Sequence, residues 1–119
     1  MTAPTHHQLG YVEFAVRDMA RARRFYGEAF GWQFNDYGPE YAGIRSADGS
    51  HETGGLALAE EVREGGPLPV LFSLDLEASR SAVLKAGGTL EKDIFAFPGG
   101  RRFHLRDPEG NVLAVYSAP

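Results

Sequence analysis

The sequence predicts an α+β fold built from two pseudo-symmetric β-α-β-β-β modules, and two observations lead to this prediction. Asp18 and Asp75 each precede an amphipathic stretch, and they lie 57 positions apart. Each stretch follows a short apolar strand and precedes three strand candidates separated by turn residues. An α+β sandwich without a repeat can also carry such a pattern. A constant offset of this length, however, is typical of duplicated supersecondary units.

The first module begins with a strand over residues 11–16. A helix follows over residues 19–30, where the aspartate in front is a favoured N-cap and apolar residues recur at three- and four-residue steps. Gly31 can adopt the left-handed conformation that ends a helix. Turn residues at 36–39 and 48–49 then divide the remainder into three strands.

The second module repeats this order. Residues 68–73 form an apolar strand, and residues 76–86 form an amphipathic helix that ends at the glycine pair 87–88. Turn residues at 97–100 and 107–111 again separate three strands. The second module therefore has the same predicted elements as the first.

We expect the two modules, about 9–60 and 67–118, to form a single domain over residues 1–119. One module alone would leave one face of its curved sheet exposed. Pairing two modules, within one chain or across a dimer, gives a curved, barrel-like sheet that encloses a cleft. Clefts of this kind are where small molecules bind.

Composition excludes several classes of function. The chain has no cysteine, which excludes disulfides, thiolate nucleophiles and cysteine-ligated zinc. A formal charge of −4 argues against a nucleic-acid or anionic-membrane partner. Residues 1–8 are polar, and no apolar run is long enough to span a membrane, so we expect a cytoplasmic protein.

Three stretches of the sequence, 11–18, 22–32 and 99–116, resemble the vicinal oxygen chelate superfamily, also called the glyoxalase/bleomycin resistance protein/dioxygenase superfamily. The resemblance covers about residues 9–117, and its most specific parts are the Phe-Tyr…Phe-Gly end of the first helix, at 25–31, and the Asp-Pro-Glu-Gly-Asn turn at 107–111. It implies the glyoxalase/bleomycin resistance fold. Because the superfamily includes isomerases, dioxygenases, thiol transferases and antibiotic-binding proteins, it does not settle the function.

The resemblance also implies where a metal would be bound. Metal-using members take four His, Glu or Gln ligands from the first and last strands of the two modules. Here those positions are occupied by Tyr11, Ala57, Leu68 and Ala114. Alanine and leucine offer no donor atom and neutral tyrosine is a poor ligand, so we expect no metal and no cofactor.

Strand alternation and the resemblance together predict the cleft lining, because residues two apart share a face. The resemblance places His104 in the cavity, ten residues before the last ligand position, and Arg102 shares its face. The lining is aromatic and aliphatic with a few polar groups. Its predicted members are Tyr11, Glu13, Ala57, Leu68, Phe72, Arg102, His104, Ala114 and Tyr116.

The polar members allow more than one role. A buried Glu13 would suit a general base; alternatively, it could pair with an arginine or lie at a solvated edge of the cleft. His104 could move protons or be a structural histidine, and Arg102 could hold a carboxylate or lie in solvent. His6 and His7 precede every predicted element, which indicates a disordered tail.

The pattern favours a metal-free protein that binds a small, partly aromatic or apolar molecule. The alternative is a metal-independent lyase, isomerase or epimerase that uses Glu13 and His104 as base and acid. A metalloenzyme with Glu13, His104 or Glu60 as unconventional ligands, and a scaffold without a ligand, also stay open. The resemblance implies a homodimer. The aromatic residues at the end of the first helix, Phe25, Tyr26, Phe30 and Trp32, are more typical of a core.

Overall fold

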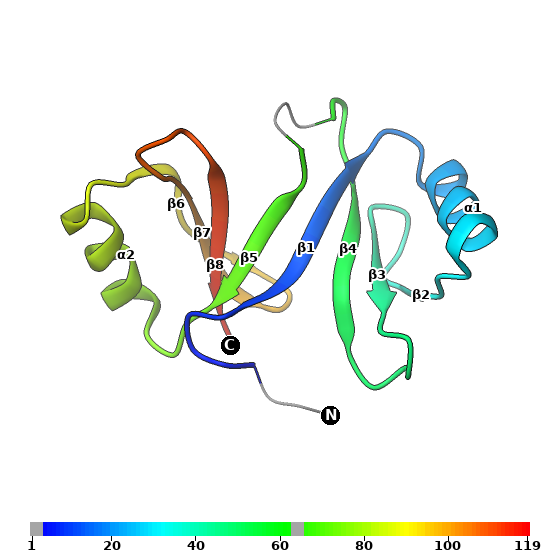
Figure 1. Ribbon diagram of the computed structural model, residues 1–119, viewed down its shortest axis with the longest axis horizontal. Coiled ribbons are helices and arrows are strands. Elements are labelled where there is room, and N and C mark those ends of the chain that lie inside the picture. The colour runs from blue at the N-terminus through cyan, green and yellow to red at the C-terminus, as the bar shows by residue number, and fades with distance from the viewer. Residues whose placement is uncertain (1–3, 63–65) are drawn as a thin grey trace. The chain divides into compact units, whose positions relative to one another are not determined.

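The computed structural model describes residues 4–62 and 66–119, which divide into two compact units. Unit 1 runs from Tyr11 to Pro67, and unit 2 contains residues 4–10 together with Leu68–Pro119. Each unit has one helix and four strands in the order β-α-β-β-β (Figure 1). The predicted duplication of the fold is therefore confirmed.

The sheet of unit 1 has the strand order β2-β3-β4-β1. Strands β1 and β4 are parallel, while the β2–β3 and β3–β4 pairs are antiparallel. The elements are β1 (Leu9–Val16), α1 (Met19–Phe30), β2 (Phe34–Asp36), β3 (Tyr41–Arg45) and β4 (Glu52–Leu58).

Unit 2 has the equivalent strand order, β6-β7-β8-β5. Its β5–β8 pair is parallel, and the β6–β7 and β7–β8 pairs are antiparallel. The elements are β5 (Leu68–Phe72), α2 (Leu76–Lys85), β6 (Thr89–Phe97), β7 (Gly100–Arg106) and β8 (Val112–Ser117).

Both helices begin at the expected aspartates. The side chains of Asp18 and Asp75 each accept a hydrogen bond of 3.0 Å from the backbone N–H three residues further on. Gly31 ends α1 with a φ of 72°, in the left-handed region. In the second unit the left-handed residue is Gly87, the first of the glycine pair, with a φ of 103°; the position 57 residues after Gly31 is Gly88. The 57-residue offset therefore holds for the caps but not for the glycine that ends the second helix.

Helix α2 covers one face of its sheet. Leu76 of α2 packs in a buried cluster with Phe103 and Leu105 of β7 and Val115 of β8. Because side chains alternate along a strand, the residues next to these in sequence point to the opposite face. That face, which we call the helix-free face of unit 2, carries the even-numbered residues of β7 and β8.

Helix α1 covers the corresponding face of unit 1. The ring of Tyr26 lies 6.0 Å from that of Phe14 on β1, and Trp32 stacks on Tyr26 at 4.8 Å. Phe25 and Phe30, however, are 57% and 63% exposed, so the expectation that they belong to the core is wrong. Their rings contact each other edge to face, and each also contacts the ring of Tyr26.

The N-terminal segment packs on unit 2. The backbone N–H of His7 donates to the Phe72 carbonyl at 2.6 Å, and His6 Nδ1 accepts from the Leu74 N–H at 2.9 Å. His7 Nε2 also lies 2.8 Å from the Ser79 hydroxyl of α2. The expected disordered tail is therefore wrong for residues 4–10, because two imidazoles bind groups at the start of α2; residues 1–3 lie outside the described part. Among the described residues, neither helix is long and apolar enough to cross a membrane.

Candidate functional site

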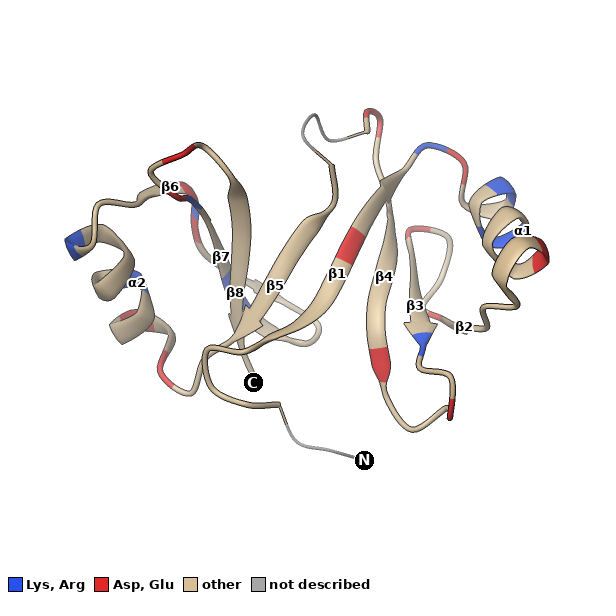
Figure 2. Cartoon of the chain, viewed as in Figure 1, with Lys and Arg blue, Asp and Glu red and all other residues tan. Residues whose placement is uncertain are grey.

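The predicted site residues of unit 1 share its helix-free face. Phe14 contacts α1, so Tyr11 and Glu13 on the same strand point to the other side of the sheet. Ala57 of β4 pairs with Ala15, which has the same orientation as Glu13. Figure 2 marks in red the acidic positions of β1 and β4. The strands therefore bring Tyr11, Glu13 and Ala57 to one face.

A chain of hydrogen bonds crosses this face. The Tyr41 hydroxyl on β3 donates to Glu13 Oε2 at 3.1 Å, and the hydroxyls of Tyr11 and Tyr41 lie 2.6 Å apart. Burial raises the pKa of Tyr11 and of Tyr41 well above the usual value near 10, and the nearby glutamate charges raise both further. Both phenols therefore keep their protons at neutral pH. Tyr41 was not among the predicted site residues.

A second polar group lies on the same unit around Glu52. Its Oε1 accepts hydrogen bonds from Asn35 Nδ2, at 3.0 Å, and from the Tyr37 hydroxyl. The hydrogen bond to Glu52 is also the main cause that raises the pKa of Tyr37. Arg45 Nε donates to Asn35 Oδ1 at 2.6 Å, so Asn35 is held in one orientation.

Two glycines make room for these side chains. Gly55 of β4 lies opposite both Glu13 of β1 and Gly43 of β3. A Cβ at Gly55 would lie 1.9 Å from the Tyr41 hydroxyl and 2.7 Å from the Tyr11 hydroxyl. A Cβ at Gly43 would lie 2.0 Å from Glu52 Oε1. The tyrosine and glutamate side chains therefore occupy the space that larger residues on β3 and β4 would fill.

The predicted site residues of unit 2 lie on the helix-free face of that unit. His104 pairs with Ala114, Arg102 with Tyr116, and Tyr116 with Phe72. Leu68 belongs to the same face because it lies four residues before Phe72 on one strand. All six predicted residues of this unit are therefore on one face, and their contact with a ligand stays a prediction.

Aromatic rings dominate this second face. Tyr116 contacts Phe72 at a centroid distance of 5.2 Å and Phe97 at 6.4 Å, both edge to face. The Arg102 guanidinium lies over the rings of Phe95 and Phe97, at 5.5 and 5.3 Å. Lys92 Nζ lies 4.1 Å from the Phe95 ring, and Phe95 also contacts His104 at 5.6 Å.

Phe95, Phe97 and Lys92 were missed because register shifts interrupt β6 at two places. Simple alternation along the sequence therefore does not give the faces of this strand. Burial raises the pKa of Tyr116, which keeps its hydroxyl protonated.

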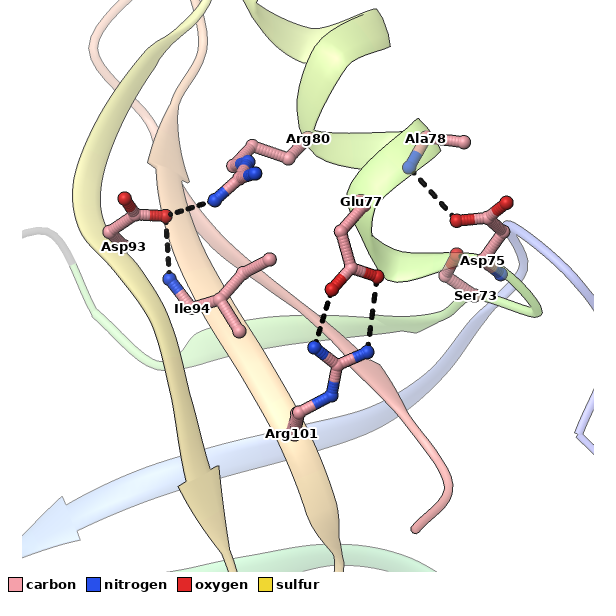
Figure 3. A network of polar contacts seen from close by, with 8 residues as sticks. All are labelled: Ser73, Asp75, Glu77, Ala78, Arg80, Asp93, Ile94 and Arg101. Atoms are coloured by element: carbon pink, nitrogen blue, oxygen red, sulfur yellow. Dashed lines mark hydrogen bonds and ion pairs between the residues drawn. The ribbon is translucent and has the colours of Figure 1, made fainter.

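The other arginines of unit 2 form ion pairs on the outside. Both terminal nitrogens of Arg101 bond Glu77 on α2, at 2.5 and 3.1 Å (Figure 3). Arg80 pairs with Asp93 at 2.9 Å. The Arg101 guanidinium lowers the pKa of Glu77 from 4.5 to about 2. These ion pairs connect α2 with β6 and β7. Arg102 and Lys92, by contrast, lie against the aromatic rings of the helix-free face.

The residues at the four family ligand positions do not fit a metal. Ala57, Leu68 and Ala114 lack donor atoms, and the hydroxyl of Tyr11 is bonded to Tyr41. The strand pairing also reassigns one of the four ligand positions. Ala114 lies opposite Val70, and Glu13, the residue 57 positions before Val70, lies opposite Gly55. Gly55, rather than Ala57, is thus the counterpart of Ala114, and glycine supplies no side-chain ligand either. Across residues 4–62 and 66–119, no group of three or more His, Cys, Asp or Glu could hold a metal ion.

Comparison with known proteins agrees with this architecture. The model of the Glyoxalase/Bleomycin resistance protein/Dioxygenase superfamily matches residues 8–115. A glyoxylase-like domain-containing protein of Didymella fabae is 29% identical over 127 residues, which cover 96% of each protein.

Solved structures share the fold. An NAD-dependent benzaldehyde dehydrogenase from Legionella pneumophila has a TM-score of 0.73 at 18% identity, covering 92% of this chain and 98% of that one. An Mn(II)-bound glyoxalase from Novosphingobium aromaticivorans has a TM-score of 0.69 at 25% identity, covering 94% and 39%. An extradiol ring-cleaving dioxygenase from B. fuscum has a TM-score of 0.70 at 19% identity, covering 98% and 34%. From the family match and the two β-α-β-β-β units, we conclude that the chain belongs to the glyoxalase/bleomycin resistance protein/dioxygenase superfamily.

Proposed function

We propose that this protein binds a small, partly aromatic or apolar molecule on the helix-free faces of its units, without a metal at the family ligand positions. The observation that carries the proposal is the aromatic face of unit 2. There Tyr116 contacts both Phe72 and Phe97 edge to face, and Arg102 lies over Phe97. Aromatic and aliphatic walls with a few placed polar groups are typical of small-molecule sites.

The residues at the ligand positions support the metal-free part of the proposal. At the positions where other members hold imidazoles or carboxylates, this chain has small or apolar side chains, which supply no donor atoms. Ala114 is the counterpart of the last ligand, and it lies between Val70 and His104 across the sheet.

Two measurements on the full chain test this proposal. Elemental mass spectrometry of protein purified without chelator should find only substoichiometric transition metal; a stoichiometric amount would contradict the proposal. Ligand-observed NMR against a panel of aromatic metabolites and antibiotics should then find binders. Phe72→Ala should weaken their binding, whereas Phe30→Ala, which removes an exposed ring from α1, should leave it unchanged.

A second candidate function follows from the hydrogen bond between Tyr41 and Glu13. A carboxylate held by a phenol in a half-buried position suits proton transfer, so the protein could be a metal-independent lyase, isomerase or epimerase with Glu13 and His104 as base and acid. Glu13→Gln separates the two functions. The substitution should abolish turnover of a bound compound if the protein is an enzyme, and should change only affinity if it is a binder.

The proposal extends to assembly and location. We expect a cytoplasmic homodimer that binds neither nucleic acid nor membranes, in line with its formal charge of −4. Sedimentation velocity at micromolar concentration should give the mass of two chains. A single species with the mass of one chain would contradict the dimer.

A further inference from the structure

The hydrogen bonds of Tyr11, Tyr41 and Glu13 have a fixed direction. A carboxylate only accepts hydrogen bonds, so Tyr41 uses its one hydroxyl proton on Glu13 Oε2, at 3.1 Å. The 2.6 Å contact between the two phenols must then use the proton of Tyr11. As a consequence, the oxygen of Tyr11 can only accept a further hydrogen bond.

The backbone below these hydroxyls is shaped to keep them in place. Gly55 lies under both oxygens, and a Cβ there would come within 1.9 Å of Tyr41 and 2.7 Å of Tyr11. Gly43 of β3 pairs with Gly55 of β4, so the surface without side chains extends across both strands. Burial also keeps both phenols protonated, because it raises the pKa of each. The direction of the hydrogen bonds is therefore stable across the neutral pH range.

We propose that Tyr11 recognises a hydrogen-bond donor on the bound molecule, and that Tyr41 is the positioning residue that imposes this preference by linking Tyr11 to Glu13. The inference rests on the proposed binding function and specifies the chemistry of the ligand. Hydroxyl, amine or amide N–H groups satisfy the Tyr11 oxygen. Ethers and ketones of the same shape do not, since they can only accept.

Matched aromatic probes test the preference. Phenol can donate a hydrogen bond, whereas acetophenone can only accept one. NMR titration of the wild-type chain should show that phenol binds about 2–10-fold more tightly than acetophenone, the range expected from one net hydrogen bond. Equal affinities, or a preference for acetophenone, would overturn the inference.

Variants separate the positioning role from a general loss of structure. In Tyr41→Phe the proton of Tyr11 is released, so the oxygen can donate, and the preference for phenol should disappear or reverse. Tyr11→Phe removes the oxygen that would accept the hydrogen bond from the ligand, so it should also abolish the preference. Tyr26→Phe is the matched control, because Tyr26 stacks on Trp32 on the helix side, and it should keep the wild-type preference.

The outcomes distinguish this inference from the proposed function. If aromatic probes bind but Tyr41→Phe keeps the wild-type preference for phenol, Tyr41 does not set the polarity and the inference fails while the binding function stands. If no aromatic probe binds the folded wild-type chain, the proposed function fails and the inference fails with it. The ¹³Cζ shift of labelled Tyr11 gives a readout without any ligand: it should move in Tyr41→Phe and stay in Tyr26→Phe.

Discussion

Replacing Gly55 by alanine tests the packing of the candidate site in unit 1. The new methyl would lie 1.9 Å from the Tyr41 hydroxyl and 2.7 Å from that of Tyr11. Both hydroxyls lie on the long axes of rigid rings, so they can move away only if the whole side chain turns about χ1 or the backbone shifts. Overfilling a packed site costs about 1–3 kcal/mol. Loss of the hydrogen bond between the two tyrosines adds about 0.5–1.5 kcal/mol.

Gly10→Ala is the matched control, because Gly10 also lies on a strand, β1, but a Cβ there would meet no atom within 4 Å. It reports the effect of alanine on the unfolded chain alone. Relative to this control, Gly55→Ala should lower the free energy of unfolding by about 2–4 kcal/mol. Urea denaturation followed by circular dichroism measures this difference. Equal stabilities of the two variants would show that the hydroxyls do not occupy the space above Gly55.

Three further substitutions test contacts of unit 2. The Arg101 guanidinium holds the pKa of Glu77 at about 2, below its usual 4.5, so this pair stabilises the fold fully above about pH 5 and progressively less as the pH falls towards 2. Arg101→Gln should remove this part of the acid sensitivity in thermal melts, and an unchanged pH profile would contradict it. His7→Ala should cost about 0.5–1.5 kcal/mol by removing the bond to a buried serine hydroxyl, whereas His51→Ala, at an exposed position, should be nearly neutral in the same urea assay. Asp75→Ala should cost about 1 kcal/mol, because it removes the N-cap of α2; no measurable change would mean that the cap is replaced by another group.

The elements could be predicted from the sequence because their signals are local. A capping aspartate, a helix period and a turn glycine act within a few residues, so their meaning does not depend on distant contacts. The glycines at 49 and 110, for example, take positive φ in the turns where they were expected. The docked N-terminal segment could not be predicted in this way. Its position depends on two hydrogen bonds with groups far along the chain: the Leu74 N–H donates to His6, and His7 bonds the Ser79 hydroxyl.

The face of each site residue could also be predicted, because alternation depends only on whether residue numbers are odd or even along a regular strand. The partners on that face could not. A 57-residue offset carries Tyr41 onto Pro98, which lies in a turn. Strand pairing gives a different counterpart for Tyr41. Tyr41 pairs with Ala57, two residues after Gly55, and Arg102 pairs with Tyr116, two residues after Ala114. Since Gly55 and Ala114 are equivalent, Tyr41 corresponds to Arg102. Because the β6–β7 hairpin is longer than the β2–β3 hairpin, the offset between equivalent residues differs from 57 in this part of the chain. Only the strand pairing reveals this difference.

Residues that pair across the four strands of each sheet form equivalent rows in the two units. These rows show that the same fold presents different side chains on the two helix-free faces. In unit 1 the row runs Glu13, Gly55, Gly43 and Asn35, with polar groups at its ends and glycines between them. In unit 2 the same row runs Val70, Ala114, His104 and Lys92.

The glycines of unit 1 let long side chains lie flat across the sheet, so Tyr41 reaches Glu13 and the hydrogen bonds acquire a direction. In unit 2 the middle of the row is filled by His104, and Arg102 is directed over the rings of Phe95 and Phe97. Substitutions in unit 1 should therefore change the preference for hydrogen-bond donors, while those in unit 2 should change affinity for aromatic rings. A substitution that altered both properties equally would mean that the two faces do not act as separate recognition elements.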